Sequence, residues 1–142
     1  MKKYYELDLA APGGPGERSV AEAGDHPKVF YSLHVILESW LGDELVHCYP
    51  CFLVSEELGA KLEGAGLTGF ELADVEVEKD RQFDLVYGDE QLPVFRWLKI
   101  TGTPGKDDFF LNGQYWLVAS EEALDIIETA KVPTLAADEY PI

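Results

Sequence analysis

The segment from Tyr49 to Lys79 constrains the fold more than any other part of the chain, because its pattern changes from strand to helix and back to strand. Phe52-Leu53-Val54 is a short apolar run that predicts a buried strand. Ser55 follows, and its hydroxyl can accept a hydrogen bond from the free N–H groups of a helical first turn that carries two glutamates. The segment predicts a capped helix between two strands. Leu58, Leu62 and Ala65 form its apolar face, and Gly64 and Gly66 end it.

A second segment, Leu117 to Leu124, repeats this pattern. It aligns with Phe52 to Gly59, and the serine and both following glutamates match. The two segments are about 65 residues apart in the sequence. The apolar positions of the two helices also match, Leu62 with Ile127 and Ala65 with Ala130. A duplicated strand and helix unit, and independent convergence on good capping chemistry, both explain the repeat.

Apolar runs elsewhere predict the remaining strands. Tyr4 to Leu9 alternates like a half-buried strand, and the β-rich run Val29 to Glu38 favours a central strand, although some of its residues also keep helical spacing. Phe70 to Glu78 alternates with a change of phase that indicates a bulge. Three further strands are expected, at Pro93–Ile100, Tyr115–Ala119 and Thr134–Ala137. The second follows a hairpin turn at Asn112-Gly113, and the third lies at the edge of the sheet.

Two segments predict irregular structure. Prolines and glycines from Ala11 to Gly16 predict a mobile loop over about residues 11–28, and the polar stretch Asp80 to Gln91 predicts a loop with a short ordered piece. The length of 142 residues fits one globular domain, residues 1–142. We expect an α+β fold in which two short helices pack on a single, mostly antiparallel or mixed sheet of about five to seven strands.

The charge of the chain excludes some partners. Eleven basic and twenty-seven acidic residues give a net charge of −16, which repels nucleic-acid phosphates and anionic membranes. Val29 to Ala60 contains no Lys or Arg, and from Asp107 to Ile142 only Lys131 opposes eight carboxylates. A solvated surface and a surface shaped for a cationic protein both explain these segments. Because no signal-peptide or membrane-span pattern occurs, and two cysteines form no disulfide framework, we expect a cytoplasmic protein.

Cys48-Tyr49-Pro50-Cys51 has the spacing of redox sites, and His47 lies next to it. A redox cysteine normally caps a helix, whereas this pair precedes a strand and the helix begins only after Ser55. A zinc site would need further ligands, which His26 and His34 could supply only through the fold. We therefore expect no cofactor, and hold Cys48, Cys51 and His47 as the only metal candidates.

The run Val54-Ser55-Glu56-Glu57-Leu58, followed by Gly66-Leu67-Thr68-Gly69-Phe70 and an alternating strand, resembles bacterial immunity proteins that neutralise polymorphic toxins. The resemblance covers residues 50–78 and, less closely, 115–137. Cys-rich members of that group carry two Cys-x-x-Cys-Gly pairs, whereas this chain has one pair with Phe52 at the glycine position.

The resemblance implies a non-enzymatic inhibitor that binds a toxin domain in the cytoplasm. The acidic composition agrees with a basic protein partner, and leaves the oligomeric state open. The residues expected at the interface are Trp40, Asp43, Glu44, Asp74, Glu76, Glu78, Asp107 and Asp108. Two alternatives remain, a small thiol or metal enzyme centred on Cys48 and Cys51, and a ligand-binding or structural domain.

Overall fold

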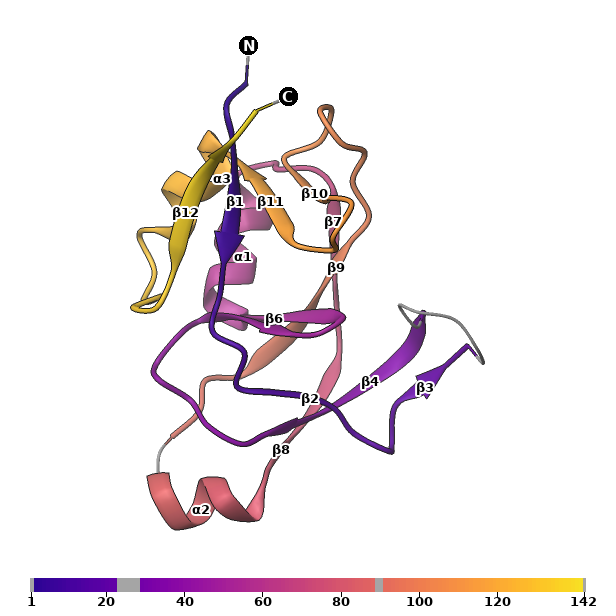
Figure 1. The fold of residues 1–142 in the computed structure, drawn as a ribbon, viewed down its shortest axis with the longest axis vertical. Helices are drawn as coiled ribbons and strands as arrows, with labels where there is room; N and C mark the ends of the chain where they lie inside the picture. The colour runs from indigo at the N-terminus through magenta and orange to yellow at the C-terminus, as the bar shows by residue number, and fades with distance from the viewer. Residues whose placement is uncertain (1, 23–28, 89–90, 142) are drawn as a thin grey trace.

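The chain forms three small sheets. The computed structural model describes residues 2–22, 29–88 and 91–141, and within these ranges it contains twelve strands and three short helices. Each sheet has four strands (Figure 1). The predicted single sheet of about five to seven strands with two helices is therefore wrong. The physical reason is that alternation identifies a strand but not the strand with which it pairs.

The first sheet contains the strand and helix segment that constrains the fold. Its strands, in spatial order, are β5 (Leu45–Cys48), β6 (Cys51–Ser55), β9 (Phe95–Ile100) and β7 (Phe70–Ala73). Helix α1 (Glu56–Gly64) follows β6, and the Ser55 hydroxyl accepts from the backbone N–H of Leu58 at 3.1 Å. The predicted capped helix is confirmed, and it ends at Gly64, followed by the C-cap Ala65 and by Gly66 at φ +72°.

The second sheet contains the repeat. Its strands, in spatial order, are β10 (Phe109–Leu111), β11 (Leu117–Ser120), β1 (Tyr4–Asp8) and β12 (Ala136–Tyr140). Helix α3 (Glu121–Ile127) follows β11, and the Ser120 hydroxyl accepts from the backbone N–H of Ala123 at 3.2 Å. The predicted hairpin through Asn112-Gly113 is confirmed as the connection between β10 and β11.

These two sheets match strand by strand. β5, β6, α1 and β7 correspond to β10, β11, α3 and β12, and the inserted strand β9 corresponds to β1. The registers agree as well. Ser55 lies opposite Phe95 in the first sheet, as the equivalent Ser120 lies opposite Tyr4 in the second. Ala73 lies opposite Trp97 in the first sheet, as the equivalent Asp138 lies opposite Glu6 in the second. β1 precedes the first hairpin in the chain and β9 precedes the second, so each half inserts one strand into the sheet of the other half. This whole-sheet match favours duplication over convergence of capping chemistry alone.

The third sheet is formed by segments inserted between the repeated elements. It contains β2 (Gly13–Pro15), β4 (Phe30–Leu37) and β3 (Val20–Ala21), and β8 (Val75–Lys79) pairs in parallel with β4. Helix α2 (Arg81–Tyr87) follows β8 and buries Phe83. The central strand predicted over residues 29–38 is confirmed as β4.

The structure corrects three local predictions. The loop expected over residues 11–28 contains β2 and β3, while residues 23–28 lie outside the described chain. The stretch from Asp80 to Gln91, expected as a loop with a short ordered piece, contains the helix α2, which the buried Phe83 anchors and which its polar neighbours conceal in the sequence. The bulge expected in Phe70–Glu78 is a change of sheet, since β7 pairs with β9 and β8 pairs with β4.

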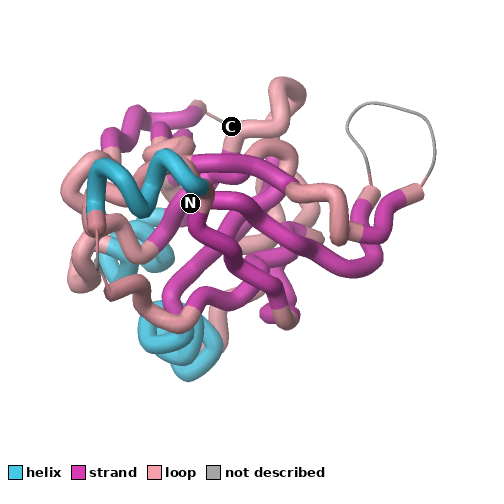
Figure 2. The backbone as a smooth tube through the Cα atoms, turned by 90° about the horizontal axis from the view of Figure 1, so that it is seen from below, coloured by secondary structure: helices cyan, strands magenta, loops and turns pink. Residues whose placement is uncertain are grey.

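The first sheet lies at the centre of the molecule because both of its faces are covered. Phe52 and Val54 pack with α1, α3 and the second sheet, whereas Cys51 and Leu53 pack with the third sheet. This double burial explains the continuous apolar run in β6. In Figure 2 the helices lie to one side of the strands, and the ends of β3 and β4 project on the other. None of the helices in the described ranges is long and apolar enough to cross a membrane.

Candidate protein interface

The two cysteines lie at the base of the tight β5–β6 turn. Cys48 ends β5 and Cys51 begins β6, directly opposite in register, and both thiols are free and buried. Burial raises the pKa of each thiol to about 12. A nucleophilic or metal-binding cysteine needs the opposite shift, because the thiolate is the reactive form. His47 is half-buried, and its burial lowers its pKa despite the nearby carboxylate of Asp8.

We expect these thiols to be unreactive in the folded protein. At about pH 8 both are protonated and covered, so a disulfide reagent should modify them at least about 100-fold more slowly than it modifies a free thiol. Absorbance of the released chromophore measures the rate, and urea-unfolded protein is the control that should react at once. Rapid modification of one thiol in the native state would contradict this assignment.

The candidate metal ligands Cys48, Cys51 and His47 belong to no metal-binding cluster among the residues that the structure describes. In the parts of the chain that it describes, no group of three or more His, Cys, Asp or Glu side chains is arranged to hold a metal ion. His26 lies outside the described residues. His34 is buried on β4, in the third sheet, where it contacts Glu78.

Asp43 and Trp40 form part of the scaffold. The Asp43 side chain is fully buried, and its Oδ2 accepts from the backbone N–H of Thr134 at 3.0 Å and from its hydroxyl at 2.6 Å. The indole N–H of half-buried Trp40 donates to the Asp43 carbonyl at 2.8 Å. Asp43 therefore lies inside the fold, where it cannot contact a protein partner.

Glu44 and Asp108 occupy equivalent places in the two halves. Glu44 Oε1 accepts from the Ser55 hydroxyl at 2.7 Å, as Asp108 Oδ1 accepts from the Ser120 hydroxyl at 2.8 Å. The second oxygen of each carboxylate reaches across to the other half. Glu44 Oε2 accepts from the backbone N–H of Lys131, after α3, at 2.7 Å, and Asp108 Oδ2 accepts from that of Thr68, after α1, at 2.9 Å. Each carboxylate thus holds its own helix cap and clamps the opposite half.

Asp107 and Asp74 are closer to solvent. Asp107 Oδ2 accepts from the backbone N–H of Thr103 at 2.7 Å, and this bond lowers the pKa of Asp107. Asp74 lies between β7 and β8 with a fully exposed side chain, 3.6 Å from the Arg96 guanidinium. An exposed ion pair at this distance contributes little stability, so the Asp74 carboxylate is available to a partner.

Glu76 and Glu78 share one face of β8, as the alternation predicts. Arg18 pairs with both carboxylates, since its Nη2 lies 2.7 Å from Glu78 and 2.5 Å from Glu76, and these hydrogen bonds lower both pKa values. The His34 ring also lies 3.0 Å from Glu78. The expected acidic strand face is therefore partly neutralised by a residue from the loop between β2 and β3, which strand alternation could not reveal.

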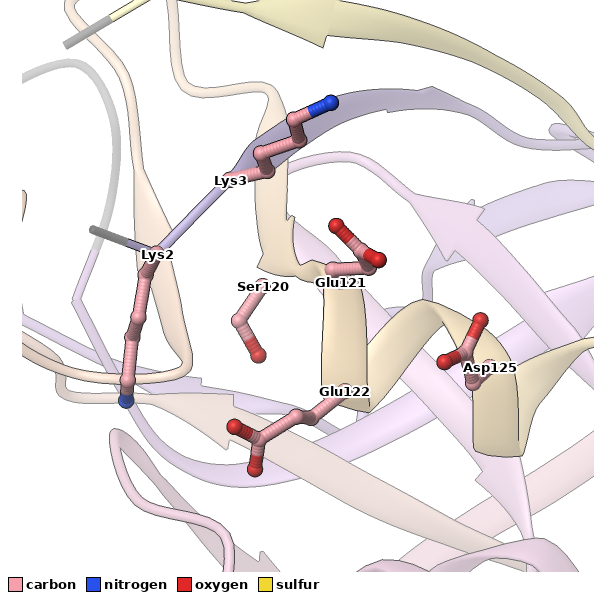
Figure 3. Close-up of a pocket in the computed structure, with 6 residues that line it drawn as sticks. All are labelled: Lys2, Lys3, Ser120, Glu121, Glu122 and Asp125. Carbon is pink, nitrogen blue, oxygen red and sulfur yellow. The ribbon is translucent and has the colours of Figure 1, made fainter.

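Seven exposed carboxylates without a close cation lie on or directly after α1 and α3, two helices that pack against each other. They are Glu56, Glu57, Glu63, Glu121, Glu122, Asp125 and Glu128. Within the described residues, no ion pair closer than 4.0 Å joins any of these side chains to a cation. An open pocket of about 400 Å³ lies beside α3. Figure 3 shows Glu121, Glu122 and Asp125 on its helical side, with Lys2 and Lys3 on the segment before β1.

Sequence reasoning passed over this helical surface because Glu56, Glu57, Glu121 and Glu122 were interpreted as first-turn residues that complement the helix dipole. The signal was the repeat itself, since two equivalent acidic helices that pack together double the local charge. The arrangement holds no set of groups poised for covalent chemistry. Its carboxylates can attract and pair with cations on another protein.

No protein-family model matches the chain, and no curated protein matches it.

Proposed function

We propose that this chain is an immunity-type inhibitor, a non-enzymatic protein that binds and neutralises a basic bacterial toxin domain in the cytoplasm. The observation that carries the proposal is the concentration of exposed carboxylates without a close cation on α1 and α3, in a chain of net charge −16. The resemblance of residues 50–78 to immunity proteins agrees with it.

Negative charge would help such an inhibitor in two ways, by raising the association rate and by competing with nucleic acid for the basic groups of the toxin. A negative surface attracts a positive one over about a Debye length, which accelerates association before any contact forms. A toxin that acts on nucleic acid carries positive charge where it binds phosphate, so an acidic inhibitor competes for the same groups. The raised thiol pKa values count against the alternative of a thiol enzyme at Cys48 and Cys51.

The test uses the C-terminal domain of the protein encoded by the gene directly upstream. We expect the purified domain to form a stoichiometric complex with this chain, and co-expression of the chain to restore growth. The association rate should fall at least about 10-fold when NaCl is raised from about 20 mM to about 500 mM. Surface plasmon resonance measures the rates.

A charge variant isolates the helical surface. The triple substitution Glu121→Gln, Glu122→Gln and Asp125→Asn should slow association by about 3- to 10-fold with little change in dissociation, because it removes steering charge from α3. The control Glu38→Gln removes one exposed carboxylate next to β4 and should change the rate little. Absence of a complex at low salt, or association that salt does not affect, would refute the proposed function.

A further inference from the structure

Three segments meet beside the outer face of the second sheet. β1 contributes Glu6 and Asp8, the β5–β6 hairpin contributes His47 and Tyr49, and the β10–β11 connection contributes Trp116. The His47 ring centroid lies 5.8 Å from that of Tyr49 and 6.3 Å from that of Trp116. The side chain of Asn112 ties the connection to β1, because its N–H donates to Glu6 at 2.5 Å. The contact between the His47 and Trp116 rings therefore joins both halves.

Tyr115 is held in a conformation that tyrosine rarely adopts. Its φ is +64°, it is the one non-glycine residue with positive φ in the described chain, and 38% of it is exposed. The turn is fixed by Asn112, whose carbonyl accepts from the Tyr115 N–H at 3.0 Å and whose side-chain oxygen accepts from the N–H of Trp116 at 3.1 Å. Glycine or asparagine adopts this backbone at a lower cost, by about 1 kcal/mol. An exposed ring at this position therefore indicates a role outside the fold.

Carboxylates border these rings. Glu6 and Asp8 share one face of β1 because alternate residues of a strand do, and Asp138 lies directly opposite Glu6 on β12. Val118 also lies opposite Glu6, which places Trp116, two residues before it, on the same face. The helices pack on the other face with Leu7. This outer face therefore combines the half-buried Trp116 ring with negative charge, and the exposed Tyr115 precedes Trp116 in the chain. The face lies on the side of the sheet opposite to the helices.

We infer that the outer-face patch, made of Glu6, Asp8, Tyr49, Tyr115, Trp116 and Asp138, is the contact surface for a Lys- or Arg-bearing segment of the toxin domain. The inference rests on the proposed function. The occupant follows from charge complementarity, because carboxylates beside aromatic rings bind a cation through ion pairs and the negative ring faces together. Tyr and Trp are also the residues that most often carry interface energy. The helical surface then accelerates approach, and the outer-face patch holds the complex.

The binding test compares Tyr115→Gly and Asp8→Asn with two matched controls, Tyr31→Ala and Glu38→Gln. Tyr31 is an exposed tyrosine on β4, and Glu38 is an exposed carboxylate directly after β4. Tyr115→Gly should weaken binding of the upstream-encoded toxin domain by about 10- to 100-fold, mostly through faster dissociation. Asp8→Asn should weaken binding by about 5- to 20-fold, and each control by less than about 3-fold.

Tyr115→Gly should not unfold the protein, because glycine adopts a positive φ without strain. The thermal midpoint of this variant should therefore equal or exceed that of the wild type, so a loss of binding would not result from unfolding. If the wild type binds and both patch variants bind equally well, the outer-face patch is overturned while the proposed function stands. If the wild type does not bind, both are overturned.

A second measurement needs no toxin. A tetra-arginine peptide is titrated into the ¹⁵N-labelled full chain, and the indole and backbone resonances are followed. We expect the largest shifts at Trp116 and Asp8, and their reduction by at least about half in Asp8→Asn. Larger shifts on α1 and α3 than at Trp116 would overturn the assignment of the outer-face patch as the contact surface.

Discussion

Gly69→Ala is expected to destabilise the protein by at least about 3 kcal/mol, enough to unfold much of it at 37 °C. Gly69 has φ +96°, and a Cβ built on it would overlap the Phe109 carbonyl oxygen. That oxygen belongs to backbone where the two halves cross, because the Phe109 N–H donates to the Thr68 carbonyl at 3.1 Å. Strain and a backbone clash therefore act together at one residue.

Two other glycines separate these causes. Gly66 has φ +72° with nothing within 4 Å of a built Cβ, so Gly66→Ala should cost only about 1 kcal/mol of strain. Gly102 has no positive φ, but its built Cβ also overlaps the Phe109 carbonyl oxygen, so Gly102→Ala should cost about 2 to 3 kcal/mol. Urea unfolding followed by circular dichroism measures all three. Equal losses at Gly66 and Gly69 would show that the crossing is not tightly packed.

The second large effect is expected at the carboxylate clamps. Asp108→Ala should destabilise the fold by about 3 to 4 kcal/mol, because it leaves the Ser120 hydroxyl and the Thr68 N–H without their acceptor. Glu44→Ala should cost less, about 1 to 2 kcal/mol, because Glu44 is only half-buried. Glu57→Ala, at an exposed position of α1, is the control and should change stability by less than about 0.5 kcal/mol. Free energies of unfolding at about pH 7 test the order.

The pH dependence gives the same clamp a second readout. Burial raises the pKa of Asp108, but hydrogen bonds from Thr68, Ser120 and Lys2 outweigh it, and the pKa lies below its usual value. A carboxylate with a lower pKa in the folded state contributes stability above its unfolded pKa, about 3.9, and loses it as pH falls through the folded pKa. Asp108→Asn should therefore lose less stability than the wild type between about pH 5 and pH 2. Parallel acid profiles for the two proteins would contradict the clamp.

Local chemistry determined much of the fold directly. Ser55 and Ser120 each accept a hydrogen bond from the third residue of the following helix, so α1 and α3 could be predicted from neighbouring residues. β1, β4 and β6 were also predictable, because their apolar patterns lie within a few residues. α2 was not, since a single buried ring, Phe83, decides it.

The tertiary structure alone decided which surface is available to a partner. Asp43 and Asp108 look like surface carboxylates in the sequence, yet both are buried as acceptors for residues far along the chain. Arg18 similarly neutralises Glu76 and Glu78 from about 60 residues away. These partners are set by how the strands pair, and strand pairing depends on contacts that no local pattern encodes.

The sequence by itself determined the charge of the protein, its two capped helices and their repeat. Only the tertiary structure showed that the repeat is two matched halves that exchange β1 and β9, and that Tyr115 has a positive φ with an exposed side chain. The physical reason is the range of the forces involved. Capping and alternation act over one or two turns of chain, whereas sheet pairing and surface formation join residues that only the complete fold brings together.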